Sequence, residues 1–153
     1  MKRLLAIVSA ITLLLILLLP VSLALAQPAD AVHVAIAGQA TGFLPAPFNG
    51  MVGVTVAAHA RGSSTSLEGS GTNHATTGST NQFSLSGSTT GDVVLLSGTV
   101  TRSTAAYLNG SSVQIEANAQ TGALTFTLVP LGGPFAGQTL VFTGSGTVVV
   151  TGE

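Results

Sequence analysis

The chain has 153 residues, and its four Lys and Arg, five Asp and Glu and three His give a formal net charge of −1 at pH 7. Only 6% of the residues are charged, which excludes the basic surface that nucleic-acid binding requires. Cysteine is absent, so no disulfide can stabilise the fold. Because 46% of the residues are hydrophobic, we expect a folded domain that is stabilised by burial and by a well-paired sheet.

The first 26 residues are predicted to be a secretory signal peptide. They contain a basic start, an apolar run and a small-x-small cleavage site: Lys2 and Arg3, residues 4–19, and Ala24-Leu25-Ala26. Cleavage before Gln27 would leave residues 27–153 as a single domain, secreted or otherwise extracytoplasmic in the cell envelope. The alternative is an uncleaved membrane anchor, since the apolar run is nearly long enough to span a bilayer. Only in that case does the sequence predict attachment to a membrane.

The mass of the exported protein tests the predicted cleavage. We expect a chain that begins at Gln27, because Ala24 and Ala26 supply the small residues that the cleavage site requires. Intact-mass spectrometry measures this directly. A chain recovered in the membrane fraction with Met1 still present would instead establish the anchor.

Eight segments alternate between apolar and polar residues, which predicts strands with one face in a core. The segments are residues 31–41, 51–60, 66–72, 82–88, 92–102, 112–119, 123–129 and 138–151. They are rich in Val and Thr, and no stretch has a helical period of useful length. Short connections favour antiparallel neighbours, because parallel crossovers need a dozen residues or more. We therefore predict an all-β fold: an up-and-down meander of about eight strands forming a closed or nearly closed small barrel. A coiled β-sandwich is the alternative.

Glycines recur on the apolar faces of several predicted strands. The examples are Gly69, Gly87, Gly98, Gly144 and Gly146. Glycine weakens a strand, so its repeated presence points to a geometric need such as the strong curvature of a closing sheet. Closure would also remove the exposed edge strands, which this chain has few charges to protect.

Two strand registers follow from these patterns. The apolar faces of residues 112–119 and 123–129 match when Ile115 lies opposite Phe126. In the first hairpin, pairing Thr41 with Met51 places His33 opposite His59 on the outer face. Two imidazoles across a strand pair can share a metal ion, but no carboxylate falls at an obvious third position. We therefore predict no metal site and no cofactor.

The predicted connections are unequal in length. Four are long, at residues 42–50, 73–81, 103–111 and 130–137, and three are short polar turns. In a meander the four long connections emerge at the same end. They contain the candidate ligand-binding residues Phe43, Phe48, His74, Tyr107 and Phe135. We expect the four aromatic rings to cluster there, as an exposed site or, alternatively, as a plug that folds into the barrel.

A catalytic set is difficult to assemble from this sequence. There is no cysteine nucleophile, and Gly69-Ser70-Gly71 and Gly144-Ser145-Gly146 fall within strands and not at a strand-to-helix elbow. We therefore predict a secreted non-catalytic binding or surface module whose partner is an apolar small molecule or a protein. One alternative is a barrel enzyme that acts on an apolar substrate in its lumen, with His74 or a buried carboxylate as acid or base. The other is a structural envelope protein that self-associates through its outer faces.

Overall fold

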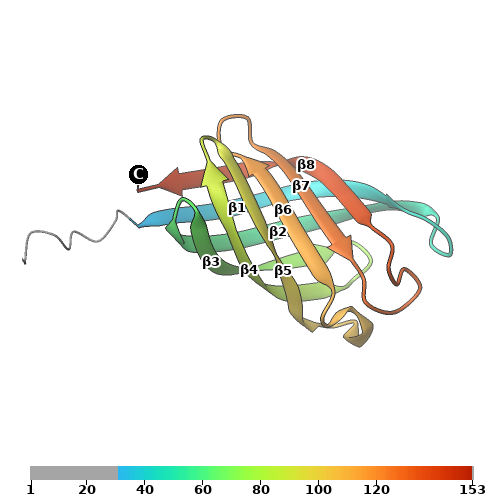
Figure 1. Cartoon of the computed structure of the whole chain (residues 1–153). Helices are drawn as coiled ribbons and strands as arrows, with labels where there is room; N and C mark the ends of the chain where they lie inside the picture. Colours follow the sequence, from blue (N-terminus) through green and yellow to red (C-terminus); the bar gives the residue numbers. More distant parts are fainter. Residues whose placement is uncertain (1–30, 153) are drawn as a thin grey trace, which may run out of the picture.

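A computed structural model describes residues 31–152, and the predicted signal peptide and its cleavage site lie outside this range. The described chain forms a closed antiparallel barrel in which each strand pairs with the next and the last pairs with the first (Figure 1). Its elements are β1 (Val32–Leu44), β2 (Gly50–Ser63), β3 (Ser66–Ala75), β4 (Thr80–Thr90), β5 (Val93–Ser103), the 3₁₀ helix η1 (Ala106–Leu108), β6 (Ser112–Asn118), β7 (Ala123–Val129) and β8 (Leu140–Thr151). The prediction of an eight-stranded meander barrel is confirmed, and the sandwich alternative is wrong.

The interior is filled by the apolar residues of the alternating pattern. Phe126 of β7 lies between Phe83 of β4 and Phe142 of β8, and its ring centroid is 6.0 Å from each neighbour. All three side chains are buried. The middle of the barrel is therefore a packed core, as expected for a closed sheet of eight strands. No helix within residues 31–152 is long and apolar enough to cross a membrane.

The glycines on the inner faces lie where neighbouring backbones approach closely. A methyl group at Gly98 would overlap the carbonyl oxygen of Ser84, and one at Gly144 would overlap that of Gln39. Both positions therefore require glycine for space. The recurrent glycines thus have the geometric reason that the sequence suggested, because they let the sheet coil tightly enough to close.

Of the two predicted registers, one is confirmed and the other is wrong. Ile115 lies opposite Phe126 in the β6–β7 pair, as predicted. In the β1–β2 hairpin, however, Phe43 pairs with Met51, so His33 lies opposite Arg61 and not opposite His59. The strands continue past the expected turn, which shrinks to residues 45–49. A shift of two residues keeps every side chain on its predicted face, so the hydrophobic pattern cannot detect it.

Candidate functional site

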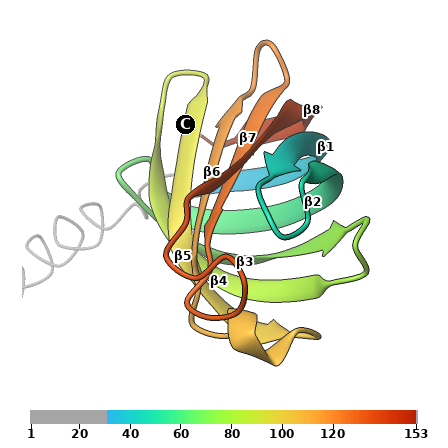
Figure 2. The same ribbon diagram turned by 90° about the vertical axis from the view of Figure 1, so that its right-hand side faces the viewer.

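The connections β1–β2, β3–β4, β5–β6 and β7–β8 lie at one end of the barrel, and Figure 2 shows the molecule with this end toward the viewer. We call it the mouth. The β5–β6 and β7–β8 connections are long, as predicted, and the first contains η1. The β3–β4 connection is only residues 76–79, because β3 runs to Ala75 and β4 begins at Thr80. The prediction of a long loop at residues 73–81 is therefore wrong.

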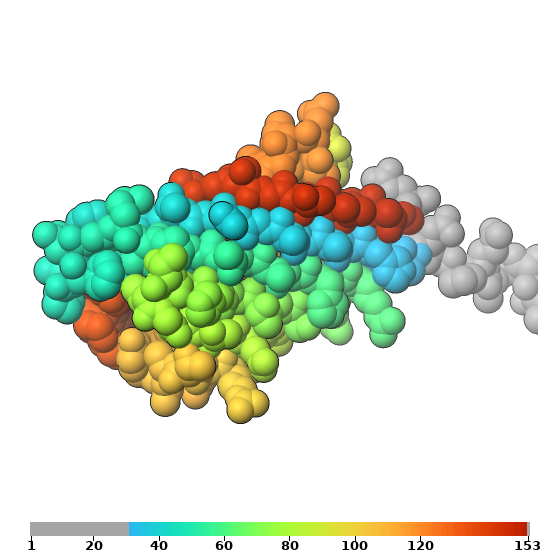
Figure 3. All heavy atoms as spheres, turned by 180° about the vertical axis from the view of Figure 1, so that it is seen from behind, coloured from blue at the N-terminus to red at the C-terminus, as the bar shows by residue number. Residues whose placement is uncertain are grey.

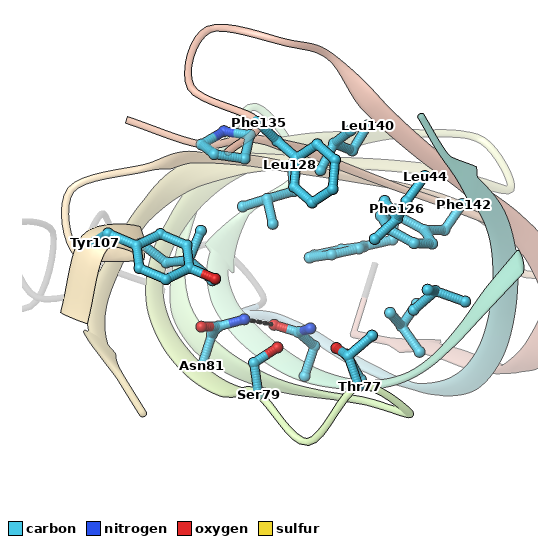
Figure 4. A pocket seen from close by; sticks show the side chains of 16 residues that line it. Leu44, Thr77, Ser79, Asn81, Tyr107, Phe126, Leu128, Phe135, Leu140 and Phe142 are labelled. Carbon is cyan, nitrogen blue, oxygen red and sulfur yellow. Dashed lines mark hydrogen bonds between the residues drawn. The ribbon is translucent and has the colours of Figure 1, made fainter. Parts of the chain in front are cut away.

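A cavity of about 70 Å³ opens inside the mouth (Figure 4). Phe126 and Phe142 belong to its lining, so the cavity begins where the packed ring stack ends. The remaining apolar walls include Leu44, Leu128 and Leu140. Its polar side is formed by four residues of β3, β4 and their connection: Asn73, Thr77, Ser79 and Asn81. The cavity therefore has an apolar body and a single polar side.

The central polar feature is a pair of buried asparagines. Asn73 and Asn81 are cross-strand partners on the inner faces of β3 and β4. Asn81 Nδ2 donates a hydrogen bond to Asn73 Oδ1 at 3.0 Å. The side chain of Asn81 is only 1% exposed, and its Oδ1 has no hydrogen-bond partner within the described chain. A buried polar atom without a partner costs about 1–3 kcal/mol, so it is uncommon in a folded protein and is often functional.

Sequence reasoning missed this pair because it assigned both residues to a loop. A usable signal was nevertheless present. The inward positions Gly69 and Gly71 of β3 continue by period two to Asn73, and Phe83 of β4 leads back by the same period to Asn81. Extending the alternation by one step in each strand would have placed both amides inside the barrel.

Two loops that contact each other partly cover the cavity. Tyr107 belongs to η1 and Phe135 to the β7–β8 connection, and both line the cavity. The Tyr107 ring lies so close to Gly133 that a Cβ added there would meet ring carbon Cδ2 at 2.5 Å. The backbone N–H of Leu131 also donates to Ser111 Oγ at 2.9 Å, which ties one loop to the other. These contacts hold the covering side chains in defined positions.

The structure brings two of the five predicted ligand-binding residues to the cavity and places three outside it. Tyr107 is half exposed at the opening, while Phe135 packs partly buried against the core. Phe43 belongs to β1, not to a loop, and is exposed on the outer face. His74 lies on the outer face of β3, where its Nδ1 and Thr80 Oγ1 share a hydrogen bond of 2.9 Å. Phe48 lies in the β1–β2 turn with its ring against Gly50.

The exposure of Phe48 leads to a stability prediction. This side chain is 50% exposed, so Phe48→Ala should change the free energy of unfolding by no more than about 0.5 kcal/mol. Urea unfolding followed by circular dichroism measures the change. A loss of about 3–5 kcal/mol, as for a buried phenylalanine, would show instead that the ring plugs the barrel.

A second group of polar side chains lies on the outer face toward the other end. His33, His59, Arg61 and Glu68 line a groove of about 570 Å³ across β1, β2 and β3. His59 Nε2 and Ser70 Oγ share a hydrogen bond of 3.3 Å. Within residues 31–152 no three His, Cys, Asp or Glu side chains are grouped so that they could hold a metal ion. The absence of a metal site remains a prediction.

The fold and the cavity together define a small closed antiparallel barrel with a mostly apolar pocket at one end. Comparisons with protein-family models, with curated proteins and with solved structures found no match. Small barrels carry many unrelated activities, so the fold alone does not define the function. None of the described residues that line the cavity is acidic, basic or a histidine. Its chemistry is therefore apolar contact combined with hydrogen bonding.

Proposed function

We propose that this protein is a secreted, non-catalytic binding module whose ligand site is the cavity of the mouth. The observation that supports this most strongly is the unpartnered Oδ1 of Asn81, which is buried beside an otherwise mostly apolar space. The Asn81 amide borders the cavity, and a rotation of this amide would let its Oδ1 accept a hydrogen bond from a ligand that carries an O–H or N–H donor. The ligand is thus an apolar group with a donor, presented by a small molecule or by a partner protein.

The size of the cavity limits how much of the ligand can enter. Its volume of about 70 Å³ is well below the 300–1,000 Å³ typical of pockets that enclose a drug-sized ligand. One small group therefore occupies the cavity, and the remainder of the ligand lies outside, where Tyr107 is half exposed. A half-exposed aromatic ring beside an opening offers a large contact area for that outer part.

The packing of the interior favours binding over catalysis. A barrel enzyme with its substrate in the lumen needs an inward acid or base and an open interior. The described lining supplies neither a carboxylate nor a histidine, and the rings of Phe83, Phe126 and Phe142 fill the middle of the barrel. His74, the residue considered for that role, lies on the outer face.

Phenol and anisole provide a direct test, because they share an aromatic ring and only phenol has an O–H donor. We expect phenol to bind saturably and to shift the side-chain amide signals of Asn73 and Asn81 in NMR titrations. Anisole should bind about threefold to tenfold more weakly, the equivalent of one hydrogen bond of about 0.5–1.5 kcal/mol. Equal affinities for the two compounds, or no saturable shift at the cavity, would contradict the proposal.

A double variant removes the two amides from the polar side of the cavity and leaves Thr77 and Ser79 in place. Replacing Asn73 and Asn81 together by leucine avoids leaving either amide without its partner, so the cost in stability should be small. The preference for phenol over anisole should disappear in this variant. Leu95→Ser, an exposed position in the other half of the barrel, serves as the control and should keep the preference.

A further inference from the structure

Large apolar side chains are exposed around the outside of the mouth. Six of the nine exposed large hydrophobic residues of the described chain lie there, and we call them the apolar rim: Phe43, Phe48, Met51, Tyr107, Leu131 and Val141. Met51 is 65% exposed and Leu131 70% exposed. Single exposed apolar residues are ordinary, but a concentration at one end of a molecule marks a contact surface.

The rim has two parts. On one side Phe43 and Met51 are direct cross-strand partners in β1 and β2, and Phe48 lies in the turn between these strands. The neighbouring strand β8 contributes Val141 to the same side. On the other side Tyr107 and Leu131 belong to the two loops that contact each other. Figure 3 shows the β1–β2 hairpin reaching furthest at this end, with the other connections of the mouth beside it. The rim therefore lies on separate projections around an opening and does not form a single groove.

The charges of the described chain are distributed unequally along the barrel. Its three carboxylates lie toward the end opposite the mouth: Glu68 faces Arg61 near the β2–β3 turn, Asp92 lies in the β4–β5 turn and Glu116 faces Leu95. At the mouth end the exposed side chain of Arg102, next to the last residue of β5, lines a groove with Thr80, Gln82 and Thr104. The mouth end therefore combines apolar side chains with a cation and lacks described carboxylates.

We propose that the mouth end docks on the surface of a lipid bilayer that contains anionic lipids. Phenylalanine, tyrosine, leucine and methionine side chains gain free energy when they enter the boundary between headgroups and acyl chains. Arg102 then binds a lipid phosphate, and the position of the carboxylates at the far end avoids repulsion from the anionic surface. A bilayer fits better than a folded partner because it deforms around separate projections.

Vesicle sedimentation with the purified exported protein, which is expected to lack the basic and apolar residues 1–26, tests this proposal. The probes are vesicles of phosphatidylcholine alone and vesicles of phosphatidylcholine mixed with phosphatidylglycerol. We expect stronger binding to the mixed vesicles. Arg102→Gln should reduce the preference for the mixed vesicles about fivefold, which is the effect of one basic side chain near an anionic surface. Equal binding of the unmodified protein to the two vesicle types, or no binding to either, would overturn the proposal. The rim would then be a contact surface for a protein partner.

The rim itself is tested by Phe43→Ser combined with Phe48→Ser. Each ring removed should weaken vesicle binding about tenfold or more, since a buried phenylalanine contributes about 1.5–3 kcal/mol. Met51→Ser is a second variant with the same direction of effect at another exposed position. The matched control is Leu95→Ser, which is exposed outside the rim and should bind like the unmodified protein. Unchanged vesicle binding by the double phenylalanine variant would overturn the proposal, because another segment of the chain would then be responsible for the binding.

Discussion

Phe126→Ala is expected to lower the free energy of unfolding by about 3–5 kcal/mol, the usual cost of truncating a buried phenylalanine. Phe126 is 0% exposed, and its ring lies between those of Phe83 and Phe142. These three rings come from β4, β7 and β8, so the middle one connects distant parts of the barrel wall. Its removal leaves a void that β-strands held in a closed sheet cannot easily collapse to fill.

Denaturant unfolding of Phe126→Ala beside Phe48→Ala measures this effect against its control. Both variants lose the same atoms, but one ring is fully buried and the other is 50% exposed. The difference between their changes in the free energy of unfolding therefore gives the contribution of burial. Domains are typically stable by about 5–15 kcal/mol, so Phe126→Ala should remain folded with a clearly lower midpoint. A cost below about 1 kcal/mol would mean that the ring stack is not the core of the barrel.

The same ring also lines the cavity of the mouth, so its loss has a functional consequence. Phe126→Ala should deepen the cavity toward the middle of the barrel. Under the proposed binding function, larger apolar groups would then enter the site. The core and the site therefore share one residue, and the packing of the stack sets how deep the cavity extends.

Much of the fold follows from the sequence because the inner face of each strand is defined by its side chains. Every second residue in β6 and β7 is apolar, so the register must place these residues on the same face. Among the registers that do so, the one with the shortest turn pairs Ile115 with Phe126. Once neighbouring strands are antiparallel with short connections, a meander is the simplest topology. Closure follows from the need to cover the edges of a sheet that carries few charges.

The ends of the strands could not be placed from side chains alone. The backbone hydrogen bonds that extend β1 to Leu44 and β3 to Ala75 do not depend on which side chain each residue carries. Phe43 and His74 are exposed on the outer face, where a strand and a loop give the same polar or mixed pattern. The prediction from the sequence therefore overestimated the lengths of the β1–β2 and β3–β4 connections and placed both residues in loops.

The candidate site was predictable only in its apolar part. The presence of aromatic residues in long connections pointed to Tyr107 and Phe135, and both line the cavity. The polar part depends on Asn73 and Asn81 pointing inward, and polar residues beside turns ordinarily indicate loops. Their burial is decided by the strand extension, which is the feature that the side-chain pattern leaves open.

Gly98→Ala is expected to destabilise the barrel by about 3 kcal/mol, at the upper end of the cost of overpacking. Gly98 lies in β5 opposite Leu85 of β4, and an added methyl group would overlap the carbonyl oxygen of Ser84. A flexible side chain could move away, but this oxygen belongs to the backbone of the neighbouring strand. Accommodating the methyl group therefore requires β4 and β5 to separate, which breaks hydrogen bonds on both sides of the contact.

Gly53→Ala is the matched control for this substitution. Gly53 also lies within a strand, β2, but an added methyl group there would meet only the Thr76 Cγ2 atom, at 3.2 Å. A shift of a few tenths of an ångström relieves this contact without breaking the hydrogen bond that Thr76 Oγ1 accepts from the Gly53 N–H. Alanine also restricts the unfolded chain, so this variant should be neutral or more stable by about 0.4–1 kcal/mol. Thermal and denaturant unfolding of both variants give the comparison. If the two substitutions change the free energy of unfolding equally, strand propensity alone explains the presence of both glycines. If only Gly98→Ala destabilises the protein, the close backbone contact that glycine permits is required to close this barrel.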